Sequence, residues 1–124
     1  MAKNFVQNGE VIDYVNAGAA ISSDDVVVIG SNGDALLGVA LVDIVNGATG
    51  AVAIDGVYTV PKVSGAVIAQ GEYVMWDSSA GAFDDNAATA AAGDVSDGAV
   101  AFESAGNGVT TIKVKFPGAP GTLA

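Results

Sequence analysis

The chain of 124 residues carries 14 acidic side chains against four lysines, a formal net charge of −10, and it contains no arginine, histidine or cysteine. Nucleic-acid binding depends on cations that neutralise phosphates, so four scattered lysines argue against that function. Without histidine and cysteine, the chain also lacks imidazole-activated or thiolate nucleophiles and the usual zinc ligands.

Length and apolar composition predict one small domain with a thin core. A chain of this length normally forms one domain and buries roughly 65% of the surface that its unfolded form exposes. Apolar types make up 51% of the residues, but only 6% are aromatic and much of the remainder is alanine. Such small side chains fill a thin layer, as between two facing sheets.

No segment predicts export or a membrane span. The longest apolar stretches, such as residues 35–42, are far shorter than the ~20 residues that a membrane-spanning helix needs. The N-terminus has no apolar signal-peptide region. We therefore expect a cytoplasmic protein without nucleic-acid or membrane partners.

The first element in chain order is residues 1–20, which we interpret as an extended N-terminal arm. This segment holds one mixed polar and apolar stretch, FVQNGEVIDYV at 5–15, followed by the small-residue linker NAGAA at 16–20.

Residues 21–116 predict a single all-β domain, a small β-sandwich or β-barrel of short antiparallel strands. Helical periodicity is nearly absent, whereas apolar runs of strand length recur between Gly, Asn, Asp and Ser. In the clearest case, residues 110–116, apolar and polar side chains alternate with the period of a half-buried strand. The other runs are 26–30, 36–45, 51–54, 57–60 and 73–76.

Three Asn-Gly steps, at 32–33, 46–47 and 107–108, separate apolar runs and predict hairpin turns. The segments 38–54 and 98–114 resemble each other, because each has a small-residue strand, an Asn-Gly turn and a second strand. We interpret them as two hairpins of one barrel or sandwich.

Two segments have different compositions. Residues 77–98 form a long acidic, alanine-rich connection in which AATAAA is compatible with one helical turn. Residues 117–124, rich in Pro and Gly, predict a flexible, frayed C-terminal tail.

The motifs of catalysis are missing, so we predict no catalytic, cofactor-binding or metal-binding residues. A phosphate loop needs a Gly-Lys step, and the chain has none. Lys62 and Ser64 are close enough in sequence for a Ser-Lys nucleophile pair. Residues two apart in a strand share a face in any case, so we interpret their proximity as accidental. The acid pairs 24–25 and 84–85 would point to opposite sides of an extended chain. The acidic loop 77–86 is a calcium candidate without EF-hand spacing, and solvated turn acids explain it better.

Three residues are interpreted as structural. Trp76 is the only tryptophan and closes an apolar run, which is typical of a core or interface anchor with its indole N–H satisfied nearby. Asp77 then starts a turn. Pro61 ends the run 57–60 or holds it at a sheet edge, because proline cannot donate to a strand ladder.

Taken together, these stretches resemble the DUF2190 family of tailed-phage proteins, which are capsid decoration or cement proteins. The most specific pieces are AKNFVQ at the start, the block that ends in GVYTVPK at 56–62, and QGEYVMWD at 70–77. The resemblance covers most of the chain in order and spacing. The chain departs from it in the connection 77–98 and in the tail.

The resemblance implies an all-β body on the outer surface of the phage head, where it bridges subunits of the major capsid protein. It implies a virion protein, present in the host cytoplasm during assembly, that forms a homo-oligomer, for which we favour a trimer and leave a dimer open. The arm would add a strand to a neighbour's sheet edge. Its apolar anchors would be Phe5, Val6, Val11 and Ile12, with Lys3, Asn4 and Gln7 at the rim.

Two alternatives from other classes remain open. A β-sandwich module that binds carbohydrate or another surface ligand would present an exposed aromatic patch. A small hydrolase would use carboxylates and a metal, but no pair of acids stands out.

Overall fold

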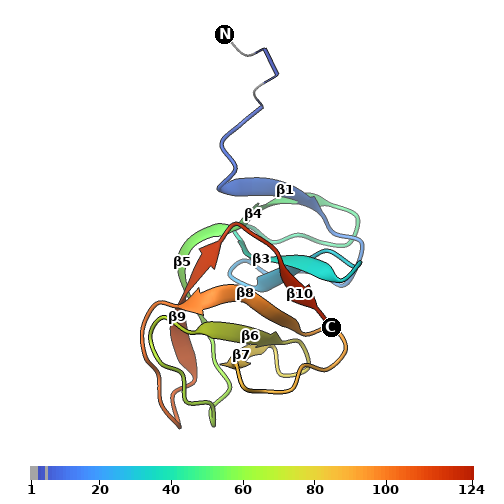
Figure 1. Cartoon of the computed structure of the whole chain (residues 1–124). Coiled ribbons are helices and arrows are strands. Elements are labelled where there is room, and N and C mark those ends of the chain that lie inside the picture. Colours follow the sequence, from blue (N-terminus) through green and yellow to red (C-terminus); the bar gives the residue numbers. More distant parts are fainter. Residues whose placement is uncertain (1–2, 5) are drawn as a thin grey trace.

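The computed structural model describes residues 3–4 and 6–124, and Figure 1 shows them folded into short strands joined by loops. No helix occurs in this part of the chain, and hence none that could cross a membrane. The strand pairs are antiparallel, so the predicted all-β fold is confirmed. The strands are β1 (Val11–Val15), β2 (Val26–Ile29), β3 (Asp34–Ala40), β4 (Thr49–Ala53), β5 (Asp55–Pro61), β6 (Tyr73–Asp77), β7 (Ala82–Asp85), β8 (Val95–Ala101), β9 (Thr111–Pro117) and β10 (Gly121–Leu123).

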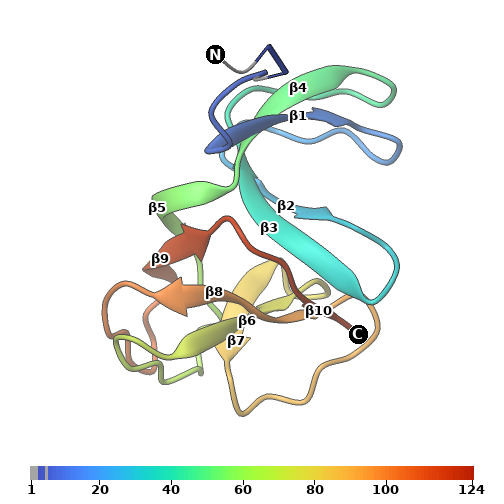
Figure 2. The same cartoon turned by 45° about the horizontal axis from the view of Figure 1, so that its top comes forward.

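The strands form two groups that meet along β3, β10 and β8. Along the main path the order is β1-β4-β3-β10-β8-β6-β7, with β2 paired to β3, and β5 and β8 both paired to β9. Figure 2 shows β1 and β4 at the top, β2 and β3 below them, β5 at the left, and β6 to β9 in the lower part. We call residues 11–54 the first half and residues 55–116 the second half.

The two halves repeat one pattern of pairing. In the first half β3 pairs with β2 and β4, and β4 with β1; in the second half β8 pairs with β6 and β9, and β9 with β5. Thus the segments 38–54 and 98–114 are indeed two hairpins. Equivalent Cα partners are Val15–Thr49 and Pro61–Thr111, Ile21–Ile44 and Ile68–Ala105, and Val26–Val39 and Tyr73–Val100.

The Asn-Gly steps lie in the loops of these hairpins. Gly33, Gly47 and Gly108 adopt φ angles of +86°, +82° and +90°, which side chains disfavour. The predicted chain reversals are therefore confirmed. Only the first is a short turn, because the other two loops span residues 41–48 and 102–110.

The connection 77–98 distinguishes the halves. It contributes β7, which pairs with β6, and Phe83 of β7 bridges to Lys62 just after β5. Its alanine run lies in turns and bends without a helical turn. The isolated bridge between Phe83 and Lys62 closes the second half just after the end of β5, although β5 itself pairs only with β9. In the described part of the first half no strand joins β1 to β2.

Two cores can be distinguished, and the larger one, the second core, is centred on the second half but also takes in Ala35, Leu37 and Val39 of β3. The aromatic rings of this core meet edge to face: Trp76 with Phe83 (5.1 Å), Phe83 with Phe116 (6.1 Å), and Phe116 with Tyr58 (6.0 Å). In the predicted strand 110–116, Ile112, Val114 and Phe116 are buried, as the alternation indicates. The buried members of the first core are all aliphatic: Val27, Ala40, Ile44, Val52 and Ile54.

The prediction of a frayed tail at 117–124 is wrong. Residues 121–123 form β10, which pairs with β3 on one side and β8 on the other. The Leu123 N–H donates to the Gly33 carbonyl and the Ala124 N–H to the Asp94 carbonyl, both at 2.9 Å. The side-chain-free Gly121 lets the strand approach Ser96 and Gly98 closely. The sequence of this segment suggests flexibility because it is rich in glycine and proline. In the structure, the missing side chain of Gly121 instead lets the strand pack closely between the halves.

The predicted arm 1–20 is also only partly separate from the domain. β1 pairs with β4 along its whole length, and Asn16 is buried. The Asn16 side-chain amide donates to the Ile44 and Ala19 carbonyls, both at 2.8 Å. We therefore restrict the word arm to residues 3–10, of which the described ones, 3–4 and 6–10, lead away from the body in Figure 1.

Candidate partner-binding surface

Lys3, Asn4, Val6 and Gln7 of the arm are exposed, and Val6 is 88% exposed. Phe5 lies outside the described residues. Exposure of an apolar side chain to water is unfavourable, and its burial against a partner would contribute favourable free energy to binding.

The strand next to the arm has an unpaired edge. The flanking bonds Ile54 N–H to Glu10 carbonyl and Asn16 N–H to Ala48 carbonyl fix which β1 residues bond to β4. Because such bonds alternate along an antiparallel strand, the backbone groups of Val11, Asp13 and Val15 face away from β4. Such an edge is a template for another strand.

Gln7 covers part of this edge. Its side-chain amide donates to the Val11 carbonyl at 2.6 Å. The outward N–H and C=O groups of Asp13 and Val15 have no such partner within the described chain. In the second half the equivalent edge is blunted, because Pro61 stands where β1 has Val15 and lacks an N–H.

Val11 and Ile12 differ from the rest of the predicted arm contact. Both are half-buried in β1, and Ile12 packs against the first core. The Ile12 side chain therefore serves the fold, whereas that of Val11 points to the opposite face of β1. A contact with a partner by these two residues stays a prediction. The exposed contact residues are those ahead of β1.

The loop between β3 and β4 presents apolar side chains that the sequence interpretation missed. The run 36–45 suggests one strand, but β3 ends at Ala40, and Leu41, Val42 and Val45 are 41%, 46% and 60% exposed. Ile44 is the buried residue of this loop, and Ala48 packs against the same core while half-buried. The following Asn-Gly step marks a loop, but it does not tell how much of the apolar run precedes it as strand.

The three residues interpreted as structural, Pro61, Trp76 and Asp77, lie at or near the ends of strands. Pro61 is the last residue of the edge strand β5, and Trp76 belongs to the second core. Asp77 ends β6, and its Oδ1 accepts bonds from the Ser79 N–H (3.1 Å), the Ser79 hydroxyl (2.7 Å) and the Ala80 N–H (3.2 Å). It therefore organises the turn into β7.

Lys62 is buried, and its ammonium group is caged by backbone carbonyls. It donates to the carbonyls of Val63 (2.8 Å), Gly106 (3.0 Å) and Val109 (3.1 Å), with that of Ser64 at 3.4 Å. The bond goes to the Ser64 carbonyl rather than its hydroxyl, so the pair has no nucleophile geometry. Lys62 follows the last residue of β5 as Asn16 follows the last residue of β1. Asn16 bonds to the loop between β3 and β4, and Lys62 bonds to the equivalent loop between β8 and β9.

The acids serve their own turns. In the described chain, no three carboxylates lie close enough together to hold a metal ion. The buried Asp94 accepts the Ser78 N–H and hydroxyl at Oδ1 and the Ala91 N–H at Oδ2. Burial raises the pKa of Asp94, but the bonds from Ala91 and Ser78 outweigh it and lower the pKa below the ordinary value. No motif in the acidic connection singles out this residue beforehand.

The aromatic side chains are mostly internal. Tyr58 and Trp76 pack in or against the second core, and Tyr14 is half-buried against the first. Tyr73 and Phe102, each 49% exposed, are the large aromatic side chains at the surface of the described chain.

These features define a small all-β protein whose candidate partner-binding surface consists of the arm and the unpaired edge of β1. A family model of phage cement proteins matches residues 6–116, so the chain belongs to the phage cement protein family. A search of curated proteins finds no match. The family implies a structural role in association with the phage capsid. It does not bear on the DUF2190 label, which stays a prediction.

Proposed function

We propose that this protein binds the outer surface of the assembled phage head and stabilises contacts between major capsid protein subunits. The observation that carries the proposal is the projecting arm beside the unpaired edge of β1 in a member of the cement family. Lys3, Asn4, Val6 and Gln7 are its exposed contacts, with Phe5 as a further apolar anchor.

The charge of the chain suits the outer surface. A net charge of −10 repels packaged DNA and keeps the free protein soluble. A protein that binds only the assembled lattice shifts the equilibrium away from broken shells by mass action.

A closed homo-oligomer fits a lattice with local symmetry axes, and we favour a trimer over a dimer. Each copy would then bring its own arm to a neighbour. Repetition over the lattice multiplies a modest affinity through avidity.

The test is deletion of residues 2–8, which leaves Gly9 and all of β1 in place. Purified heads are mixed with either protein, sedimented, and the bound copies counted by quantitative mass spectrometry. We expect near-stoichiometric binding of the full chain and loss of most copies without the arm. The melting temperature of the truncated protein controls for folding. Equal copy numbers for the two proteins would contradict the role of the arm, and absence of the full chain from intact heads would contradict the cement function.

A further inference from the structure

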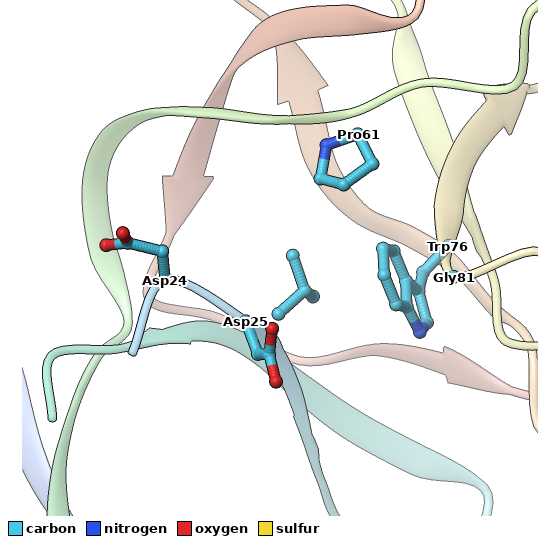
Figure 3. Close-up of a pocket in the computed structure, with 6 residues that line it drawn as sticks. Asp24, Asp25, Pro61, Trp76 and Gly81 are labelled. Carbon is cyan, nitrogen blue, oxygen red and sulfur yellow. The ribbon is translucent and has the colours of Figure 1, made fainter. Parts of the chain in front are cut away.

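A cavity of about 250 Å³ lies where the two halves meet. One wall is the start of β2 with the residues before it, and the other is formed by β5, β6 and the turn into β7. Figure 3 shows Pro61 and the Trp76 ring across the space from Asp24 and Asp25. The residues that line the cavity are Asp24, Asp25, Val26, Pro61, Trp76 and Gly81.

Trp76 supplies the cavity with a donor. The residue is 8% exposed and its ring packs against Phe83. Its indole N–H has no hydrogen-bond partner within the described chain, which differs from the satisfied N–H that the sequence predicts. In Figure 3 the ring nitrogen lies at the lower end of the Trp76 ring, and the Asp25 carboxylate lies across the space from that ring. No side-chain nitrogen or oxygen of the described chain is both buried and unpartnered, so this N–H is open to solvent and can donate to a group that enters the cavity.

Two carboxylates stand at the mouth. Asp25 Oδ2 accepts the Ser22 N–H at 2.9 Å, and Asp24 is held at a φ of +76°. The ion pairs of the described chain, Lys113 with Glu103 and Lys115 with Asp55, leave both without a cation. The mouth therefore favours a positive charge.

The volume limits the occupant to one side chain. Pockets for metabolites have volumes of roughly 300–1,000 Å³. A lysine fits, because its methylene stem can lie along Val26, Pro61 and the Trp76 ring while the ammonium reaches the carboxylates. The main-chain carbonyl beside it would accept a hydrogen bond from the Trp76 indole N–H.

The lysines of the chain point to the source of this side chain. Lys62 is caged by carbonyls, and Lys113 and Lys115 face carboxylates. Lys3 has no ion pair with a described residue, and residues 1–9 of the sequence contain no acid. It is thus the lysine that is available to a second copy.

We propose that the cavity of one copy receives the Lys3 side chain of a second copy. The arm leads away from its own body in Figure 1, and eight extended residues span at most ~28 Å, so it extends toward a neighbour. Arm into cavity is a head-to-tail contact, and such a contact forms a closed ring where the rotation between copies allows it. The proposal deepens the homo-oligomer part of the proposed function and rests on it.

The sole tryptophan makes the test direct. The protein without residues 2–8 is titrated with a synthetic peptide of residues 2–9, AKNFVQNG, while the emission of Trp76 is followed. We expect a saturable spectral shift, and binding at least ten-fold weaker for the Lys3→Gln peptide. The Asp24→Asn/Asp25→Asn protein should bind the unchanged peptide at least ten-fold more weakly, and Asp34→Asn, at the far end of the β2–β3 hairpin, should not.

Equal binding of the two peptides, or no shift with either at millimolar concentration, would overturn the proposal. The same would follow from an Asp34→Asn protein as impaired as the double variant. Sedimentation of the full-length Lys3→Gln protein, which we expect as a monomer, checks the assembly itself. Head binding is measured separately: a chain that takes up the peptide but never binds heads refutes the cement function and leaves the contact between copies standing.

Discussion

Lys62 is the clearest case of a residue whose partners lie far along the chain. Its ammonium bonds join the segment after β5 to the loop before β9. Truncation leaves several carbonyls without a donor, and each buried unsatisfied group costs about 1–3 kcal/mol.

We therefore expect Lys62→Met to lower the free energy of unfolding by about 3 kcal/mol in urea titrations. Several backbone carbonyls lose their donor, but the site is partly open to water, so the costs do not add in full. Lys113→Met, at an exposed ion pair, is the matched control and should change it by less than about 1 kcal/mol. A similar loss in both variants would show that the carbonyl cage contributes nothing specific.

Asp94 gives stability a dependence on pH. Because its pKa is lower in the folded than in the unfolded chain, its contribution is complete above the ordinary aspartate pKa of about 3.9. It is lost as the pH falls through the lower folded pKa. We expect Asp94→Asn to be less stable than the parent at pH 7 and the gap to narrow below about pH 4. Urea midpoints from pH 7 to pH 2 measure this, and a gap that stays constant would contradict it.

At the scale of elements, β10 tests how closely the halves are joined. A Cβ on Gly121 would collide with the backbone of Ser96 and Gly98, whereas one on Gly106 meets nothing within 4 Å. We expect Gly121→Ala to cost about 1–3 kcal/mol, as overpacking does. Gly106→Ala, the control, should stay within about 0.5 kcal/mol of the parent. Equal melting curves for the two variants would mean that β10 yields without strain.

The free edge of β1 can be blocked without disturbing the sheet. The Val15 N–H faces away from β4, so Val15→Pro removes a donor that the fold does not use and copies Pro61 of the second half. We expect the copy number on heads to fall several-fold while the melting temperature changes by only a few degrees. Val15→Thr keeps the N–H and should bind normally. If Val15→Pro binds like the parent, the edge takes no part in the contact.

The sequence predicts those elements that depend on local pattern. Alternation in 110–116 identifies β9, and the Asn-Gly steps locate three chain reversals. β7 and β10 escape prediction, because Ala82–Asp85 and Gly121–Leu123 are stable as strands only through the partners they find in β6, β3 and β8. For the same reason the arm is visible in sequence but the cavity is not, since its walls come from both halves.

At the scale of the whole molecule, the duplication is unequal. The second half is closed by β7 and packed with aromatic rings, whereas the first is open between β1 and β2 and has a smaller aliphatic core. Less buried apolar surface means that opening the first half costs less free energy.

We expect hydrogen exchange followed by mass spectrometry to show this difference. The amides of β6, β8 and β9 should be the slowest to exchange, and those of β1, β2 and β4 should exchange faster by one or more orders of magnitude. Opening of a smaller core needs less free energy, and each 1.4 kcal/mol changes the open population about ten-fold.

The protein bound to heads is the matched comparison. If the arm, the β1 edge and the cavity mouth contact partners there, the protection of their amides against exchange should rise toward that of the second half. Uniform exchange in the free protein would show that β10 makes the halves one cooperative unit, and unchanged exchange on heads would place the contact elsewhere.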